Sequence, residues 1–159
     1  MHRVVANSTP IIALCYIGKL HLLKDLYEEI MIPTAVYREL CAKQDSGVIS
    51  ELDRDWICIC KIKNEMAKTF FKSQLHDGEV EVMILGKEEN ATLLILDDKN
   101  AKKHAKYLGF SVTGTLGVLL RAKREGYVDT VKPLIEELVS KGIYLDDGII
   151  ALCLNEAGE

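Results

Sequence analysis

The chain has 159 residues, 48% of them hydrophobic, which suits one domain with a buried core. Its 20 basic and 24 acidic side chains give a net charge of −4, which excludes a protein that coats nucleic acid by bulk electrostatic attraction. No apolar run approaches the roughly 20 residues that a membrane-spanning helix requires.

Strands and helices are predicted to alternate along the chain. Short apolar or alternating runs predict strands over residues 3–6, 29–33, 56–63, 91–96 and 110–114. Helical periodicity and capping signals predict helices over residues 11–18, 19–27, 34–43, 78–90, 99–109, 115–126 and 131–142, with one or more further turns within 146–159. Ser8 or Thr9 is expected to cap the first helix, with Pro10 in its first turn, and Asp77 or Gly78 to lie near the N-cap of the helix over 78–90.

This alternation predicts an α/β fold. Strands that read as continuous apolar runs between helices indicate a parallel sheet that is covered on both faces. We therefore expect a three-layer α/β/α sandwich with a central parallel sheet. Residues 1–145 would form the domain, and residues 146–159 would be a C-terminal helical extension of it.

Polar residues follow the predicted strands at the point where each strand ends. In open α/β sheets the functional crevice lies beyond the carboxyl ends of the strands, so these positions are ranked first as site candidates. The helices that carry Glu39 and Glu79 begin at the same edge. The candidates at this edge are Asn7, Glu39, Glu79, Asp97, Asp98, Thr113 and Thr115.

Converging carboxylates repel one another unless a cation neutralises them. A donor set made of oxygen atoms, without histidine or cysteine at metal-binding spacing, favours Mg²⁺ or Mn²⁺. Hard cations held in this way mostly serve phosphoryl chemistry. The sequence therefore indicates phosphodiester hydrolysis.

Simpler interpretations exist for each acid taken alone. Asp98 can cap the following helix in a solvated turn. Glu39 can be an exposed helical residue, and Glu79 with Glu81 can favour a helix N-terminus through the macrodipole. Only the common placement of these acids favours a shared site.

The cysteines and histidines are less informative. Five cysteines in apolar surroundings, and a first segment without a secretory signal pattern, favour a cytoplasmic protein with reduced thiols. Cys58 and Cys60 are expected to be structural, because a CxC without a second pair is a weak zinc signal. His76 and His104 are expected at the surface.

The sequence resembles the PIN-domain family, in the branch of small prokaryotic proteins similar to VapC-type toxins. The resemblance extends from about residue 4 to about residue 140, and its pieces follow in the family's order. It rests on "VVANSTPIIALCYIGKLHLL", "EEIMIPTAVYREL", "LHDGEVEVMILG", "LLILDDKNAKKHAKYLGFSVTGTLGVLLRAK" and "VKPLIEEL".

This resemblance implies a ribonuclease that depends on Mg²⁺ or Mn²⁺. It also implies a homodimer and the toxin role of a toxin-antitoxin pair, with RNA as substrate and a small antitoxin protein as partner. The family's four acids fall on Asn7, Glu39, Glu79 with Glu81 as the alternative, and Asp97 with Asp98 beside it. Ser8 or Thr9, and Thr113 or Thr115, match the polar residues that line such sites.

Asn7 departs from the family pattern, which has an aspartate at this position. An amide oxygen can bind Mg²⁺ but adds no charge, so the alternative is a catalytically weak or inactive module that binds RNA or a protein. Lysines near the rim would steer the RNA backbone, and Lys99, Lys102 and Lys103 are the candidates. Any one of them can equally be part of a solvated helix face.

Overall fold

A parallel sheet of five strands forms the centre of the computed structural model, which describes residues 3–43, 47–71 and 75–159. The strands are ordered β3-β2-β1-β4-β5, and each paired neighbour is parallel. Their bounds are β1 (Val4–Ala6), β2 (Ile30–Pro33), β3 (Ile57–Cys60), β4 (Leu93–Ile95) and β5 (Val112–Thr113). The predicted α/β fold is confirmed.

The central strands are apolar on both faces because helices cover both sides of the sheet. Val5 and Ala6 in β1 are fully buried, and Ala6 pairs with Ile95 of β4. The edge strand β3 is shorter than the predicted 56–63, because its ladder with β2 ends where Cys60 pairs with Pro33, the last residue of β2.

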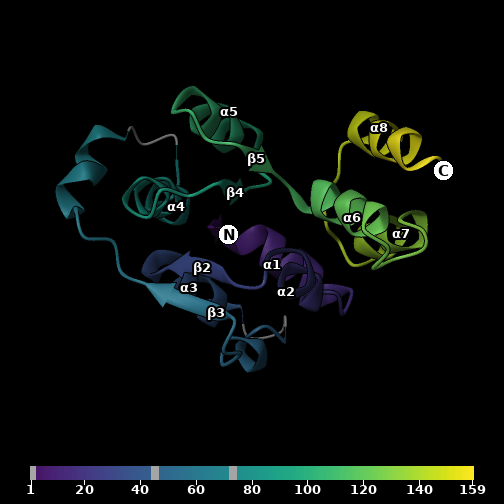
Figure 1. Ribbon diagram of the computed structural model, residues 1–159, viewed down its shortest axis with the longest axis horizontal. Helices are drawn as coiled ribbons and strands as arrows, with labels where there is room; N and C mark the ends of the chain where they lie inside the picture. Colours follow the sequence, from purple (N-terminus) through teal and green to yellow (C-terminus); the bar gives the residue numbers. More distant parts are fainter. Residues whose placement is uncertain (1–2, 44–46, 72–74) are drawn as a thin grey trace.

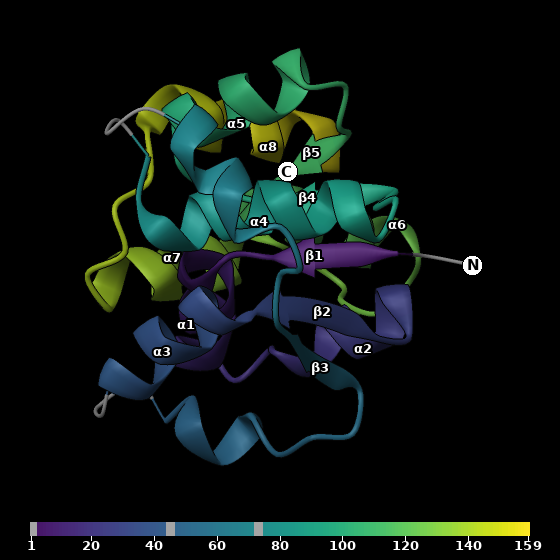
Figure 2. The same cartoon turned by 90° about the vertical axis from the view of Figure 1, so that its left-hand side faces the viewer.

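Helices follow every strand. Their bounds are α1 (Ser8–Tyr16), α2 (His21–Tyr27), α3 (Thr34–Ala42), α4 (Asp77–Glu88), α5 (Lys99–Tyr107), α6 (Thr115–Arg124), α7 (Lys132–Ser140) and α8 (Asp147–Ala157), with short 3₁₀ helices η1 (Ile49–Glu51) and η2 (Glu65–Phe70). Figures 1 and 2 show α4 on one side of the sheet, against β1, β2 and β4, and α6 to α8 on the other.

The start of α1 differs from the prediction. Its N-cap is Asn7 in place of Ser8 or Thr9; the Asn7 side chain makes no capping bond, and the Ser8 hydroxyl donates to Glu39. The N-cap of α4 is His76, and the expected Asp77 and Gly78 are the next two residues; Glu79 reaches back to the His76 backbone N–H. The 3₁₀ helices η1 and η2 were not predicted.

The carboxyl edge of the sheet is where β1, β4 and β5 end side by side. The Asn7 N–H donates to the Ile95 carbonyl at 3.0 Å, and the Leu96 N–H donates to the Thr113 carbonyl at 2.8 Å. These bonds extend the ladders by one residue and fix the places of Asn7 and Asp97. Across the three described ranges, none of the helices has the length and apolar character needed to cross a membrane.

Candidate functional site

Asn7 lies at the centre of the carboxyl edge, directly after β1, with its side chain 5% exposed. Its Oδ1 atom is buried and has no hydrogen-bond partner within the described ranges. An unpaired buried carbonyl oxygen costs about 1–3 kcal/mol, so it requires an explanation. A bound ligand that accepts a lone pair of Asn7 Oδ1 would explain it.

Glu39 of α3 presents its carboxylate beside Asn7. The buried Ser8 hydroxyl donates to Glu39 Oε2 at 2.6 Å and holds the side chain in place. A Cβ atom at Gly78 would collide with Glu39 Oε1 and would lie 3.2 Å from Asn7 Oδ1. Glu39 and Asn7 therefore converge on the start of α4, and only glycine leaves room for both.

Glu79 of α4 is a buried carboxylate in this region, 5% exposed. Its Oε1 accepts a hydrogen bond from the His76 N–H at 3.0 Å. Burial raises the pKa of the Glu79 carboxyl above its ordinary value; the His76 bond opposes this, and the nearby charges of Asp98 and Glu39 add to it. Glu79 is therefore electrostatically close to both acids.

Asp97 and Asp98 follow β4 and have different partners. The Thr115 N–H donates to Asp97 Oδ1 at 2.7 Å, and the Thr115 hydroxyl donates to Asp97 Oδ2 at 2.6 Å. Asp98 is exposed and accepts a bond from the Ala101 N–H at 2.9 Å. Asp98 thus caps α5, as its simpler interpretation predicts, and also lies near Glu79.

An open recess of about 660 Å³ adjoins these acids. It is lined by Glu39, Leu75, His76 and Asp77, which come from α3 and from the start of α4. The recess gives a solvent-borne ligand a route to the Glu39 carboxylate. His76, expected as a simple surface residue, lies in its wall.

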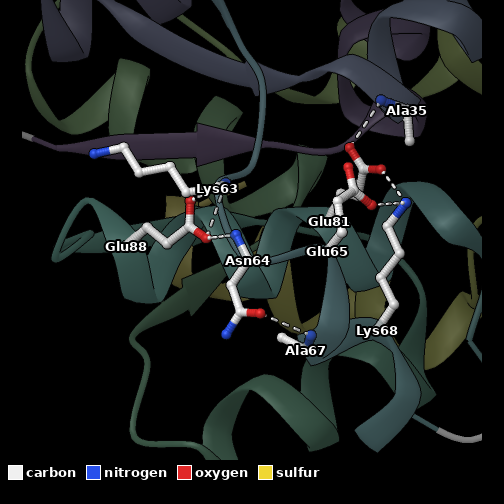
Figure 3. A network of polar contacts seen from close by, with 8 residues as sticks. All are labelled: Ala35, Lys63, Asn64, Glu65, Ala67, Lys68, Glu81 and Glu88. Carbon is white, nitrogen blue, oxygen red and sulfur yellow. Dashed lines mark hydrogen bonds and ion pairs between the residues drawn. The ribbon is translucent and has the colours of Figure 1, made fainter.

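Glu81 is held differently from the other acids. Its carboxylate is buried and accepts a bond from the Ala35 N–H at 3.1 Å, while its second oxygen pairs with Lys68 Nζ at 2.8 Å. Figure 3 shows this pair together with the neighbouring Glu65. Both oxygens are bound, so the structure supports a structural role, and the assignment of Glu81 as the alternative ligand stays a prediction.

The segment that contains η2 is attached to α4 at a second point. Glu88 accepts hydrogen bonds from the backbone N–H groups of Lys63, at 2.8 Å, and Asn64, at 2.9 Å (Figure 3). Together, Glu81 and Glu88 secure the η2 segment along the helix. The sequence did not identify Lys68 or Glu88 as important, because contacts between residues far apart along the chain leave no local sequence pattern.

The polar residues proposed for substrate binding are spread out. Ser8 and Thr115 bind the acids, as described, and Lys99 is exposed at the start of α5. Thr113 faces α6: a Cβ atom at Gly117 would collide with its hydroxyl, and it lines a separate recess with Tyr27 and Arg121. Their roles toward a substrate stay predictions.

The acids do not surround a single point. Within the described residues, no three side chains of the histidine, cysteine, aspartate or glutamate types lie close enough to hold a metal ion together. The carboxylates of Glu39 and Glu79 are near each other, and the additional oxygen beside Glu39 belongs to an amide, Asn7. Gly78 was expected only near a helix N-cap and His76 only at the surface, so the sequence placed neither residue at this site.

The parallel sheet with polar residues gathered at its carboxyl edge is the architecture of a PIN-like α/β protein. The chain belongs to the PIN-domain family: the sequence pattern of the DUF3368 family, described as a PIN domain, matches residues 3–159. Members of this family are typically nucleases and usually bind a divalent metal ion.

A solved structure supports the same fold. The chain is similar to a PilT N-terminus domain protein from the hyperthermophilic archaeon Sulfolobus solfataricus P2, with 19% sequence identity and a TM-score of 0.53. The match covers 90% of this chain and 97% of that chain. At this identity the likeness concerns the fold alone. No curated protein matches the chain.

Replacing Glu81 by alanine should destabilise the fold by about 1–3 kcal/mol, because it leaves the buried Ala35 N–H without its acceptor and removes the buried partner of Lys68. Urea denaturation measures this change. The control is Glu65→Ala, which removes the exposed partner of Lys68 and should cost about 0–1 kcal/mol. Equal effects of the two substitutions would contradict the structural role of Glu81.

Glu79→Gln should stabilise the metal-free protein at neutral pH by roughly 1 kcal/mol, because the charged form of Glu79 is penalised by burial. The pKa of Glu79 is raised in the folded state, so protonated Glu79 favours folding at low pH. The parent protein loses this contribution as the pH rises from about 4.5 through the pKa of the folded state. Thermal unfolding in a chelator should therefore show an advantage of Glu79→Gln that grows with pH. An advantage independent of pH would show that Glu79 is not the group responsible.

Proposed function

We propose that this protein is a metal-dependent ribonuclease of the PIN type that hydrolyses RNA phosphodiester bonds. The proposal rests on the buried Asn7 Oδ1, which lies beside the Glu39 carboxylate and has no hydrogen-bond partner among the residues that the structure describes. A neutral oxygen without a donor, next to acids that repel one another, is the environment that a hard dication would satisfy.

The residues present fit Mg²⁺ or Mn²⁺. Asn7 Oδ1 and the carboxylates of Glu39 and Glu79 would hold the ion directly or through water, and the assignment of Asp97 as a further ligand stays a prediction. All of these donors are oxygen atoms, and the Ser8 and Thr115 hydroxyls keep two of the carboxylates oriented. A raised pKa, as at Glu79, is expected of a buried carboxylate in a metal site from which the cation is absent.

The ion, when bound, would supply charge neutralisation at the phosphate and activation of water. The chain supplies positioning. Ser8 fixes Glu39, Thr115 fixes Asp97, and the exposed Asp98 has the position to orient an attacking water molecule near Glu79. The recess beside Glu39 would admit the RNA strand.

Glu39→Gln should reduce RNA cleavage by roughly 100-fold or more, beyond the 10- to 100-fold typical of outer-shell partners. Cleavage of a labelled RNA in Mn²⁺ measures the rate. Glu136→Gln removes the same charge from an exposed position on α7 and should leave the rate unchanged. Undiminished cleavage by Glu39→Gln would exclude this site as the source of activity.

The second candidate is a PIN-fold module that binds RNA or a protein without hydrolysis. It is favoured by the neutral Asn7 and by acids that do not surround a single point. Calorimetric titration with Mn²⁺ distinguishes the two candidates, since the nuclease should take up the ion at millimolar concentrations or below. Asn7→Asp adds the missing charge and should tighten binding by about tenfold. Absence of uptake in both chains would leave the binding module as the better description.

We further propose the toxin role, a small antitoxin protein as partner, and a homodimer. The apolar side chains of α6 are buried within the chain, so α6 does not offer a dimer surface. Exposed apolar side chains instead lie on and near α7 and α8: Val139, Tyr144, Ile149 and Leu152. Sedimentation of the purified chain tests the dimer, and growth on induction in cells tests the toxin role.

A further inference from the structure

Lys102 is the basic residue that lies within the acidic edge. It occupies the second turn of α5, and its side chain is half-buried and folds over Gly114. A Cβ atom at Gly114 would lie 2.8 Å from Lys102 Nζ and 2.7 Å from Asp97 Oδ1. The ammonium and the carboxylate therefore approach one small space, which the missing side chain of Gly114 leaves open.

Lys102 is not needed to hold Asp97 in place. Thr115 already donates to both oxygens of that carboxylate, at 2.7 and 2.6 Å. Lys102 Nζ forms no hydrogen bond or ion pair of its own within residues 3–43, 47–71 and 75–159. Other lysines of the chain do donate to an oxygen atom: Lys68, Lys87, Lys123 and Lys141. The ammonium of this half-buried residue, which has no partner among the described residues, is available to an anionic ligand.

The neighbouring lysines do not share this placement. Lys99 and Lys103 belong to the same helix but are exposed, and their side chains face solvent. Of the three basic candidates on α5, Lys102 is the one that approaches Asp97. The sequence alone did not separate the three, because their difference depends on the close passage of the backbone at Gly114.

We propose that Lys102 binds a phosphate oxygen of the RNA strand next to Asp97. This inference rests on the proposed ribonuclease function and names a substrate contact within it. An incoming phosphate is repelled by the acids of this edge, so a cation that approaches Asp97 lowers the cost of entry. The ammonium has three donors and acts as a point charge toward phosphate.

The test is binding of a fluorescent single-stranded RNA, measured by anisotropy with Ca²⁺ in place of Mg²⁺ so that the strand stays intact. Lys102→Ala should weaken binding roughly tenfold, the loss of one charge-assisted contact. It should also reduce the slope of log affinity against log salt by about 0.7, the share of one phosphate on a single strand. Lys102→Arg, which keeps the charge, should retain most of the affinity.

Lys103→Ala is the matched control, because it removes the same charge from an exposed position one residue away. It should change RNA affinity less than twofold, within the screening expected of a solvated charge. Unfolding temperatures of each variant confirm that the fold is intact. Equal effects of Lys102→Ala and Lys103→Ala would overturn the proposal.

Two further outcomes separate this inference from the function on which it rests. If the unaltered chain binds and cuts RNA while Lys102→Ala alters only Mn²⁺ affinity, Lys102 acts on Asp97 alone, and only this inference fails. If the unaltered chain binds no RNA at all, the proposed function and the role of Lys102 fail together. A loss of RNA binding with unchanged Mn²⁺ affinity supports the role of Lys102, and cleavage of RNA by the unaltered chain supports the proposed function.

Discussion

Repulsion among acidic side chains at the carboxyl edge of the sheet is the constraint to which the local structure responds. Each carboxylate accepts a hydrogen bond from a nearby donor, which offsets part of the cost of placing the charges together. The pairs are Ser8 with Glu39, His76 N–H with Glu79, Thr115 with Asp97, Ala101 N–H with Asp98, and Ala35 N–H with Glu81. The uncharged Asn7 is the exception, since the described part of the chain offers its Oδ1 no donor.

The starts of the helices supply most of these donors. The first N–H groups of a helix have no partner within it, and the positive end of the macrodipole favours negative charge there. Thr115 opens α6, Ala101 lies in the first turn of α5, and Ala35 lies in the first turn of α3. The parallel topology brings these helix starts to one edge, so the fold stabilises the acids before any ligand is considered.

The strands and most helices followed from the sequence because their signals are local. The apolar run before Asp97 and the glycines that close α5 and α6 each mark an element within a few residues. The candidate acids were also found from the sequence, since the end of a strand is itself a local feature. Their partners were not, because a bond such as Ser8 to Glu39 joins residues 31 positions apart.

The division of roles between Glu79 and Glu81 shows the same limit. Both are buried acids on α4, two residues apart, and the sequence offers no means to separate them. The structure separates them through Lys68 of the η2 segment, which pairs with Glu81, whereas Glu79 accepts a bond from the His76 N–H. Likewise, Lys102 differs from its neighbours only because the chain passes closely at Gly114.

The two-point attachment of the η2 segment has a mechanical consequence. Glu81 and Glu88 are seven residues apart on α4, about two helical turns. They bind the η2 segment at two places, Glu81 at Lys68 and Glu88 at Lys63. A segment bound to one helix at two points moves together with that helix. A small displacement of α4 that accompanied events at Glu79 would therefore be carried to the exposed Met66 and Phe70, on the outer surface of the protein.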